Sequence, residues 1–168
     1  MRKIVLLGDL VLKAKAKEVI KIDASIRQLV SIMADAMMSA GGIGIAAPQV
    51  GESLQLAIVD VPREIGGIGR VVIINPRIIS AYGSETAEEG CLSVPGVQVK
   101  VKRYKEISVE AMDLNGDKVT YKANGLFARA IQHEIDHLNG ILITDNLTPI
   151  RRYFVNRKVL KIERGAKL

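Results

Sequence analysis

The chain has very few of the side chains that ligate transition metals or form disulfides. Its 168 residues include two histidines, one cysteine and no tryptophan. A lone cysteine excludes an internal disulfide, so the sequence suits a reducing cytoplasm. Any site built from imidazole must draw on these two histidines, and any thiolate in it must come from Cys91.

Linkers, internal repeats and long apolar runs are also absent. No Pro/Ser-rich or charged segment divides residues 1–168, which predicts a single domain with a substantial core. The apolar run Ile4–Leu7 is interrupted by Gly8-Asp9, so it is too short for an export signal. Because no run is long enough to cross a bilayer, we expect a cytoplasmic protein without membrane contact.

Hydrophobic periodicity and turn residues predict an α+β domain. Apolar residues recur at helical spacing between Ile26 and Met37, after the candidate N-cap Asp23. Asn115-Gly116 is suited to a hairpin turn. Strands are expected over residues 54–61, 71–74, 107–111 and 118–121. Helices do not alternate regularly with these strands, which favours antiparallel or mixed sheets over a doubly wound parallel sheet.

The net charge of +6 is concentrated at the end of the chain. Residues 150–168 hold seven basic residues and one acidic residue, Glu163, which accounts for all of it. Thr148-Pro149 supplies an N-cap and a first-turn proline for a helix here. Four apolar residues are expected along one side of that helix, with Phe154 and Val155 toward the core: Ile150, Phe154, Val155 and Val159. The basic residues form either a solvated face or a contact with the ribosome, whose RNA is a dense polyanion.

The strongest motif is HEIDHLNG at residues 133–140. In a helix, His133 and His137 lie about one turn apart, so both imidazoles can reach one metal ion while Glu134 projects beside them. This is the layout of a metal-dependent hydrolase. A catalytic site of this kind needs a third protein ligand, and Cys91 lies in a segment of small residues and turn formers that could bring its sulfur to the helix.

A glycine-rich pattern at residues 42–47 matches the dinucleotide fingerprint G-x-G-x-x-A. That fingerprint requires a strand before it and a helix after it. Here the predicted helix precedes the pattern, and Pro48 disfavours a helix after it. We therefore do not interpret the pattern as a nucleotide site.

Three motifs together resemble those of the peptide deformylase family: GIGIAAPQVG at 42–51, EGCLS at 89–93 and QHEIDHLNG at 132–140. The resemblance implies a compact α+β fold of sheets around the motif helix. It also implies removal of the formyl group from formyl-methionine at the start of nascent polypeptides. One divalent metal ion is implied, Fe²⁺, for which Zn²⁺, Ni²⁺ or Co²⁺ can substitute. We expect a monomer.

The resemblance also assigns roles to individual residues. Cys91, His133 and His137 would bind the metal. Glu134 would be the general base and acid while metal-activated water attacks the formyl carbon. Gln49 and the backbone N–H of Leu92 would stabilise the oxyanion. Five residues would bind the substrate, as a side-chain pocket beside His133 or as strand edges that pair with the peptide: Ile43, Gly44, Gly90, Leu126 and Ala130.

Two other readings stay open at the level of the residues. A generic HExxH metallopeptidase would take its third ligand from a His or Glu after the motif helix, where this chain offers only Glu163. A non-catalytic, ribosome-associated module with a structural metal would close the site with four ligands, and this chain offers three of the thiolate or imidazole type.

Overall fold

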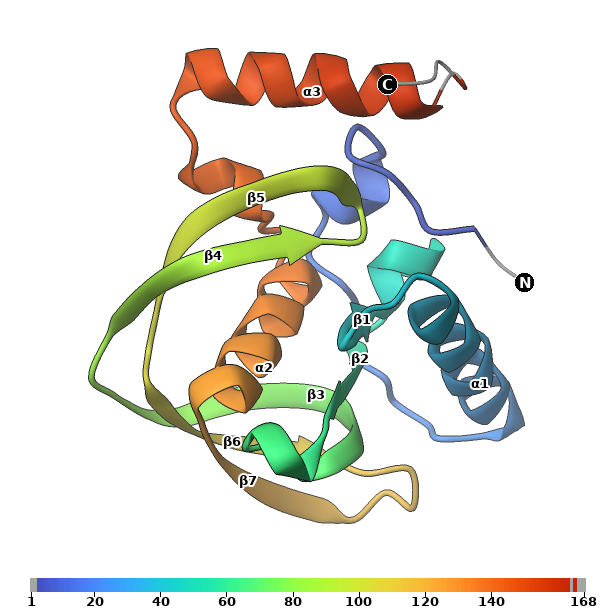
Figure 1. Cartoon of the computed structure of the whole chain (residues 1–168). Coiled ribbons are helices and arrows are strands. Elements are labelled where there is room, and N and C mark those ends of the chain that lie inside the picture. Colours follow the sequence, from blue (N-terminus) through green and yellow to red (C-terminus); the bar gives the residue numbers. More distant parts are fainter. Residues whose placement is uncertain (1–2, 164, 166–168) are drawn as a thin grey trace.

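The computed structural model describes residues 3–163 and 165. The described residues form a five-stranded sheet, a two-stranded hairpin and three α-helices. The sheet, the hairpin and the other two helices are arranged around helix α2, Gly125–Leu138 (Figure 1). The sheet lies on one side of α2 and the hairpin on the other (Figure 1). This arrangement confirms the predicted α+β class.

The five-stranded sheet has the order β1-β2-β3-β6-β7, and every neighbouring pair is antiparallel. Its strands are β1 Gly44–Ala46, β2 Leu56–Val61, β3 Gly69–Tyr82, β6 Glu106–Met112 and β7 Lys118–Asn124. The predicted turn at Asn115-Gly116 joins β6 to β7, and Asp113 Oδ1 accepts hydrogen bonds there from the backbone N–H groups of Asn115 and Asp117. Strand β3 runs well beyond the predicted 71–74.

Alternate residues of β2 face opposite sides of the sheet, as the pleat requires. Ala57, Val59 and Val61 are buried against α2. Leu56 and Ile58 are buried against α1, Ala24–Ser39, on the other side. The sheet is therefore covered on both faces around β2, which explains the continuous apolar character of this strand.

Helix α1 begins and ends close to its predicted limits. Asp23 is the N-cap, and its side chain accepts hydrogen bonds from the backbone N–H groups of Ser25 and Ile26. The glycine-rich residues 42–47 follow it as strand β1 and the start of a short 3-10 helix, Ala47–Val50. No α-helix follows this pattern, so the context of a dinucleotide site is absent.

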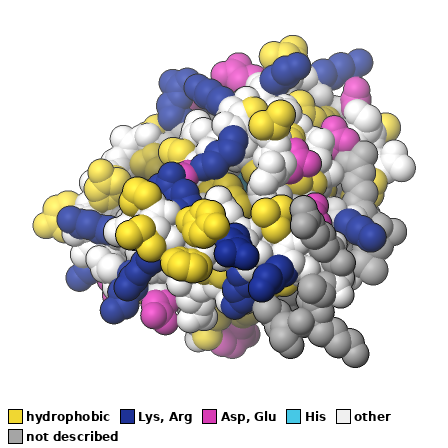
Figure 2. Space-filling model, turned by 90° about the horizontal axis from the view of Figure 1, so that it is seen from above, with side chains coloured by type: hydrophobic (Ala, Val, Ile, Leu, Met, Phe, Trp, Pro, Cys, Tyr) yellow, Lys and Arg dark blue, Asp and Glu magenta, His cyan; other side chains and the backbone are white. Residues whose placement is uncertain are grey.

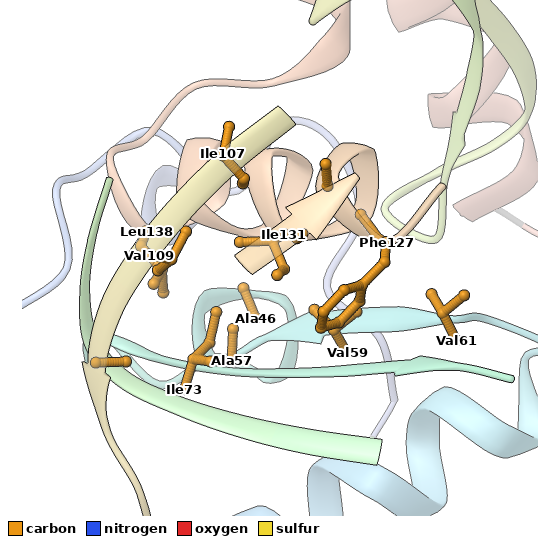
Figure 3. Packing of buried hydrophobic residues seen from close by; sticks show 14 of the residues in the cluster. Ala46, Ala57, Val59, Val61, Ile73, Ile107, Val109, Phe127, Ile131 and Leu138 are labelled. Atoms are coloured by element: carbon orange, nitrogen blue, oxygen red, sulfur yellow. The ribbon is translucent and has the colours of Figure 1, made fainter. Parts of the chain in front are cut away.

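Helix α2 packs on the sheet through one face and leaves its other face to the hairpin. The side chains of Phe127, Ile131 and Leu138 point from α2 into the core formed with β2 and its neighbours (Figure 3). The helix ends before Gly140, whose φ of 74° favours glycine and whose added Cβ would overlap the carbonyl of Lys13. This close approach fixes the last turn of α2 against the N-terminal segment.

The hairpin of β4, Glu85–Cys91, and β5, Val94–Arg103, was not predicted. The first strand, ETAEEGC, consists of acidic, small and polar residues, which do not show the apolar alternation of a strand. The hairpin is antiparallel, and Cys91 is the last residue of β4. Its placement brings Cys91 to the side of α2 that faces away from the sheet.

Helix α3, Pro149–Glu163, begins where Thr148-Pro149 predicted. The expected set of inward residues was partly wrong. Val159 is buried with residues of β5, and Val155 packs beside it, but Ile150 and Phe154 are 72% and 62% exposed. The helical period places Ile150 and Phe154 on the outer face, away from Val159. Arg164 and Lys167 lie outside the described residues.

Helix α3 is attached to strand β5. The Nζ of Lys158 donates a hydrogen bond of 2.8 Å to the carbonyl of Gly96, and Val159 packs on Val94 and Val99. Residues 94–98 of the same strand also line the main cavity of the molecule. In the described part of the chain no helix is long and apolar enough to span a membrane.

Candidate active site

The three predicted metal ligands meet between α2 and the end of β4. The ligand atoms of Cys91, His133 and His137 lie within 4.8 Å of one another. The Sγ of Cys91 is 3.2 Å from the Nε2 of His137. The one-turn spacing of the histidines on α2 and the end of the hairpin together produce this cluster, as the motif predicted.

A cavity of about 970 Å³ opens beside the cluster. It is lined by all the residues predicted to bind substrate, namely Ile43, Gly44, Gly90, Leu126 and Ala130. Cys91, His133 and Glu134 also line it, whereas His137 is buried behind them at 1% exposure. A ligand in the cavity can therefore reach the metal site from one side.

Glu134 is held in a dry position at the cavity wall. Its side chain is buried, and burial raises the pKa of the carboxyl to about 7. A carboxyl with a pKa near neutrality can both accept and return a proton at physiological pH. Gly44 makes room for it, because a Cβ added to Gly44 would overlap Oε1 of Glu134.

The electrostatics of the cluster favour positive charge. Burial lowers the pKa of His133, but hydrogen bonds with Cys91 and Glu89 outweigh it and raise that pKa to about 10. Burial, and then the nearby charge of His133, lower the pKa of His137 well below its ordinary value. The surroundings thus favour the charged form of His133 and the neutral form of His137.

The residues fit a divalent metal ion. A thiolate and two imidazoles are the donor set of three-ligand catalytic sites, which keep one coordination position open. Among the described residues, two buried side-chain atoms lack a hydrogen-bond partner, His137 Nδ1 and Glu134 Oε2. Glu134 Oε2 belongs to the cavity wall, so this carboxylate oxygen is left for a further bound group.

Gln49 is oriented by its neighbours. Its Oε1 accepts a hydrogen bond of 2.9 Å from the backbone N–H of Ala46, which turns Nε2 toward Ser93 Oγ at 3.2 Å and Cys91 Sγ at 3.7 Å. Leu92 follows Cys91 in the turn between β4 and β5 and lines the cavity. Both predicted oxyanion donors are therefore beside the thiolate ligand.

A buried ionic network behind His133 was missed by the sequence reasoning. Glu89 is 6% exposed, and its Oε2 lies 3.0 Å from Nδ1 of His133. Arg103 donates to both oxygens of Glu89 and also to Asp136. Burial alone would raise the pKa of Glu89, but hydrogen bonds with His133 and Arg103 lower it to about 2.

This network sets the chemistry of His133. An ionised Glu89 accepts the Nδ1–H of His133, which leaves Nε2 free as the metal-binding nitrogen. The signal for Glu89 was available in the alternation of residues 87, 89 and 91, which places Glu89 on the same face of β4 as Cys91. It could be read only after β4 had been recognised as a strand.

Residues 1–153 match the family model of polypeptide deformylase. The chain belongs to the polypeptide deformylase family. A peptide deformylase of Dictyoglomus thermophilum is 49% identical over 145 residues, covering 86% of this chain and 92% of that protein. The match to the family supports one catalytic metal, for which Cys91, His133 and His137 form the site.

Solved peptide deformylases have the same fold. The crystal structure from Legionella pneumophila matches with a TM-score of 0.90 at 42% identity, covering 98% of this chain and 96% of that chain. The structure from Ehrlichia chaffeensis in complex with actinonin matches with a TM-score of 0.91 at 41% identity, covering 96% and 97%. The deformylase interpretation therefore holds over the metallopeptidase and the binding-module alternatives.

Gly44 provides a test of the space around Glu134. We expect Gly44→Ala to lower deformylase turnover at least tenfold with the metal still bound, because the new methyl group displaces Glu134 and not a ligand. Ser31→Ala, at an exposed position of α1, is the control and should keep the turnover of the parent. Metal content and kcat are measured for both. Equal turnover in the two variants would contradict the proposed packing.

Proposed function

We propose that this deformylase hydrolyses the N-terminal formyl group of nascent polypeptides that begin with formyl-methionine, with Glu134 as general base and acid. The observation that carries this proposal is the position of Glu134. It lies beside three metal-ligating side chains, at the wall of a cavity, with a pKa of about 7.

Glu134 carries both proton transfers of the hydrolysis. When bound, a divalent ion would act as a Lewis acid toward a water molecule and the formyl oxygen. Glu134 takes a proton from the attacking water as the new C–O bond forms at the formyl carbon. It returns that proton to the leaving amine as the C–N bond breaks, so the products are formate and a free N-terminal amine.

Two donors are proposed to stabilise the negative charge that develops on the formyl oxygen. Nε2 of Gln49 and the backbone N–H of Leu92 flank Cys91 at the cavity wall. Loss of one such donor costs on the order of 3 kcal/mol in comparable oxyanion sites. The bond from Ala46 to Gln49 Oε1 keeps the donor end of the amide turned toward the site before substrate binds.

The cavity suits an apolar, unbranched first side chain. Ile43, Leu126 and Ala130 provide apolar walls close to His133. The edges at Gly44 and Gly90 lie on β1 and β4, on either side of the cavity, where an extended peptide could pair with either strand. Gln98, which pairs with Gly90 in the hairpin, also lines the cavity and is the polar side chain proposed to contact residues beyond the first.

We infer that Fe²⁺ is the native metal, with Zn²⁺, Ni²⁺ or Co²⁺ as substitutes. A thiolate beside two imidazoles lowers the effective charge of the ion and suits a soft, redox-capable metal. We also infer that the protein acts as a monomer in the cytoplasm. One chain supplies a full set of ligands and cavity residues, so the site needs no second subunit, and an oxidisable thiolate favours a reducing compartment.

The outer face of α3 is proposed to dock on ribosomal RNA. Seen from the α3 side, hydrophobic side chains and Lys or Arg side chains are intermingled over this face (Figure 2). Tyr153 and Phe154 are exposed, and the guanidinium of Arg157 lies 5.8 Å from the centre of the Tyr153 ring. Exposed aromatic and basic side chains in one stripe are suited to stacking on bases and neutralising phosphates.

Glu134→Gln tests the catalytic role. The amide keeps the shape of the side chain and all three ligands but cannot carry the proton, so turnover of formyl-methionyl peptides should fall about a hundred- to ten-thousand-fold. Metal content should stay at the level of the parent. Glu64→Gln, on an exposed 3-10 helix, is the control and should retain full turnover. Near-normal turnover of the metallated Glu134→Gln protein would refute the assignment.

The metal and its sulfur ligand are tested by oxidation. The iron-loaded protein should lose turnover quickly in peroxide, because iron generates oxidants beside the Cys91 thiolate, whereas the nickel- and zinc-loaded forms should survive longer. Metal should also protect Cys91 from a thiol reagent. If the reagent modifies Cys91 at the same rate with and without metal, Cys91 is not a ligand.

The docking face is tested by removing its free charges. Arg151, Arg157 and Lys161 are exposed on α3, and their joint replacement by Gln should weaken co-sedimentation with ribosomes and flatten its salt dependence. The control carries the same charge loss elsewhere, at the exposed residues Lys21, Lys105 and Lys122. Both variants should hydrolyse a free formyl peptide normally. Equal ribosome binding by the two variants across a salt series would mean that the basic residues of α3 form only a solvated face.

A further inference from the structure

One partly buried cation at the cavity wall, Arg129, is not used by the mechanism above. Arg129 lies on α2 one turn before His133, and its side chain is 11% exposed. Its Nη1 donates to Glu89 Oε1 at 2.8 Å and to the carbonyl of Val101 at 3.1 Å. Its Nη2 donates to the carbonyl of Glu85 at 3.2 Å. One guanidinium thus bonds to both β4 and β5 while it lines the cavity.

Arg129 and His133 are bound by the same carboxylate. Oε1 of Glu89 accepts from Arg129, and Oε2 faces Nδ1 of His133 at 3.0 Å. Residues four apart on a helix share a face, so Glu89 bridges one full turn of α2. The carboxylate can neither rotate nor withdraw from His133 without breaking its bond to Arg129.

Arg129 differs from the second cation on Glu89. Arg103 belongs to β5 and holds Glu89 from within the hairpin, and it also donates to Asp136 on α2. Arg129 is the one of the two that belongs to the helix of the histidine ligands and also lines the cavity. Its three acceptors match the planar, forked donor geometry of a guanidinium, which a lysine cannot reproduce.

We propose that Arg129 is a positioning residue: it fastens the β4-β5 hairpin to α2 so that Glu89 holds His133 in its metal-binding orientation and the Gly90 edge stays at the cavity. The inference rests on the proposed ligand roles of Cys91, His133 and His137. Without Arg129, the hairpin is still joined to α2 through Asp136 and Gln132. Glu89 then loses the cation that holds it on the side of His133, so His133 is oriented less firmly and the metal leaves more easily.

The test measures release of metal, independently of turnover. Protein loaded with one equivalent of nickel or zinc is mixed with excess chelator, and the rate of metal loss is followed. Arg129→Met should release metal about ten- to a hundredfold faster than the parent, the range typical of lost outer-shell partners. Arg129→Lys, which keeps one donor for Glu89, should lie between the two. With metal in excess, Arg129→Met should regain kcat while its KM for formyl peptides stays raised.

Arg152→Met is the matched control. Arg152 also donates to three acceptors, the carbonyls of Thr144, Asp145 and Leu147, but it lies on α3 away from the metal ligands. Its replacement should leave the release rate unchanged. The proposal is overturned if Arg129→Met holds metal as long as the parent, or if Arg152→Met loses it equally fast. If Arg129→Met does not fold, the rate of metal release from Arg129→Lys is compared with that of the parent. Equal rates would then overturn the proposal. A parent protein that binds no metal would instead refute the proposed function.

Discussion

The burial of one carboxylate, Glu89, is the constraint on which the site depends. An ionised carboxylate in a dry interior is costly unless every lone pair is engaged by a donor. Glu89 meets this condition only when β4, β5 and α2 are all in place, because its partners Arg103, Arg129 and His133 come from the hairpin and the helix. The packing of the hairpin on α2 therefore also orients His133, and neither is achieved without the other.

The sheet supplies the rigid support for this arrangement. Helix α2 is fixed by Phe127, Ile131 and Leu138 on the sheet side, so its opposite face is presented at a defined angle to the hairpin. Gly140 fixes the end of the same helix by its contact with Lys13. Because the apolar face and the ligand face belong to one helix of fourteen residues, packing in the core determines the geometry of the site.

The local motifs could be predicted from the sequence, and the partners between motifs could not. His133, Glu134 and His137 follow from helical spacing, and Cys91 from the scarcity of other ligands. Strand β4 was not predicted because the charged and small residues of ETAEEGC are typical of a loop. They form a strand only through pairing with β5. The contacts of Glu89 with Arg103 and Arg129 depend on hairpin register and helix placement together, which no single window of sequence contains.

The outer helix shows a different kind of ambiguity. Apolar residues occur on both faces of α3, so hydrophobic pattern alone could not choose which face is buried. The choice is made by β5, where Val94 and Val99 leave room for Val159. Phe154 is left outside with Tyr153, and this is the reason that an aromatic stripe accompanies the basic residues.

The attachment of α3 to β5 has a mechanical consequence. The bond from Lys158 to Gly96, with Val159 buried in the same cluster as residues of β5, joins the outer helix to the strand that forms a wall of the cavity. An enzyme bound to a large surface through α3 would therefore hold its cavity at a defined distance and orientation relative to that surface. A growing chain would then have to reach a minimum length before its first residue could enter the cavity.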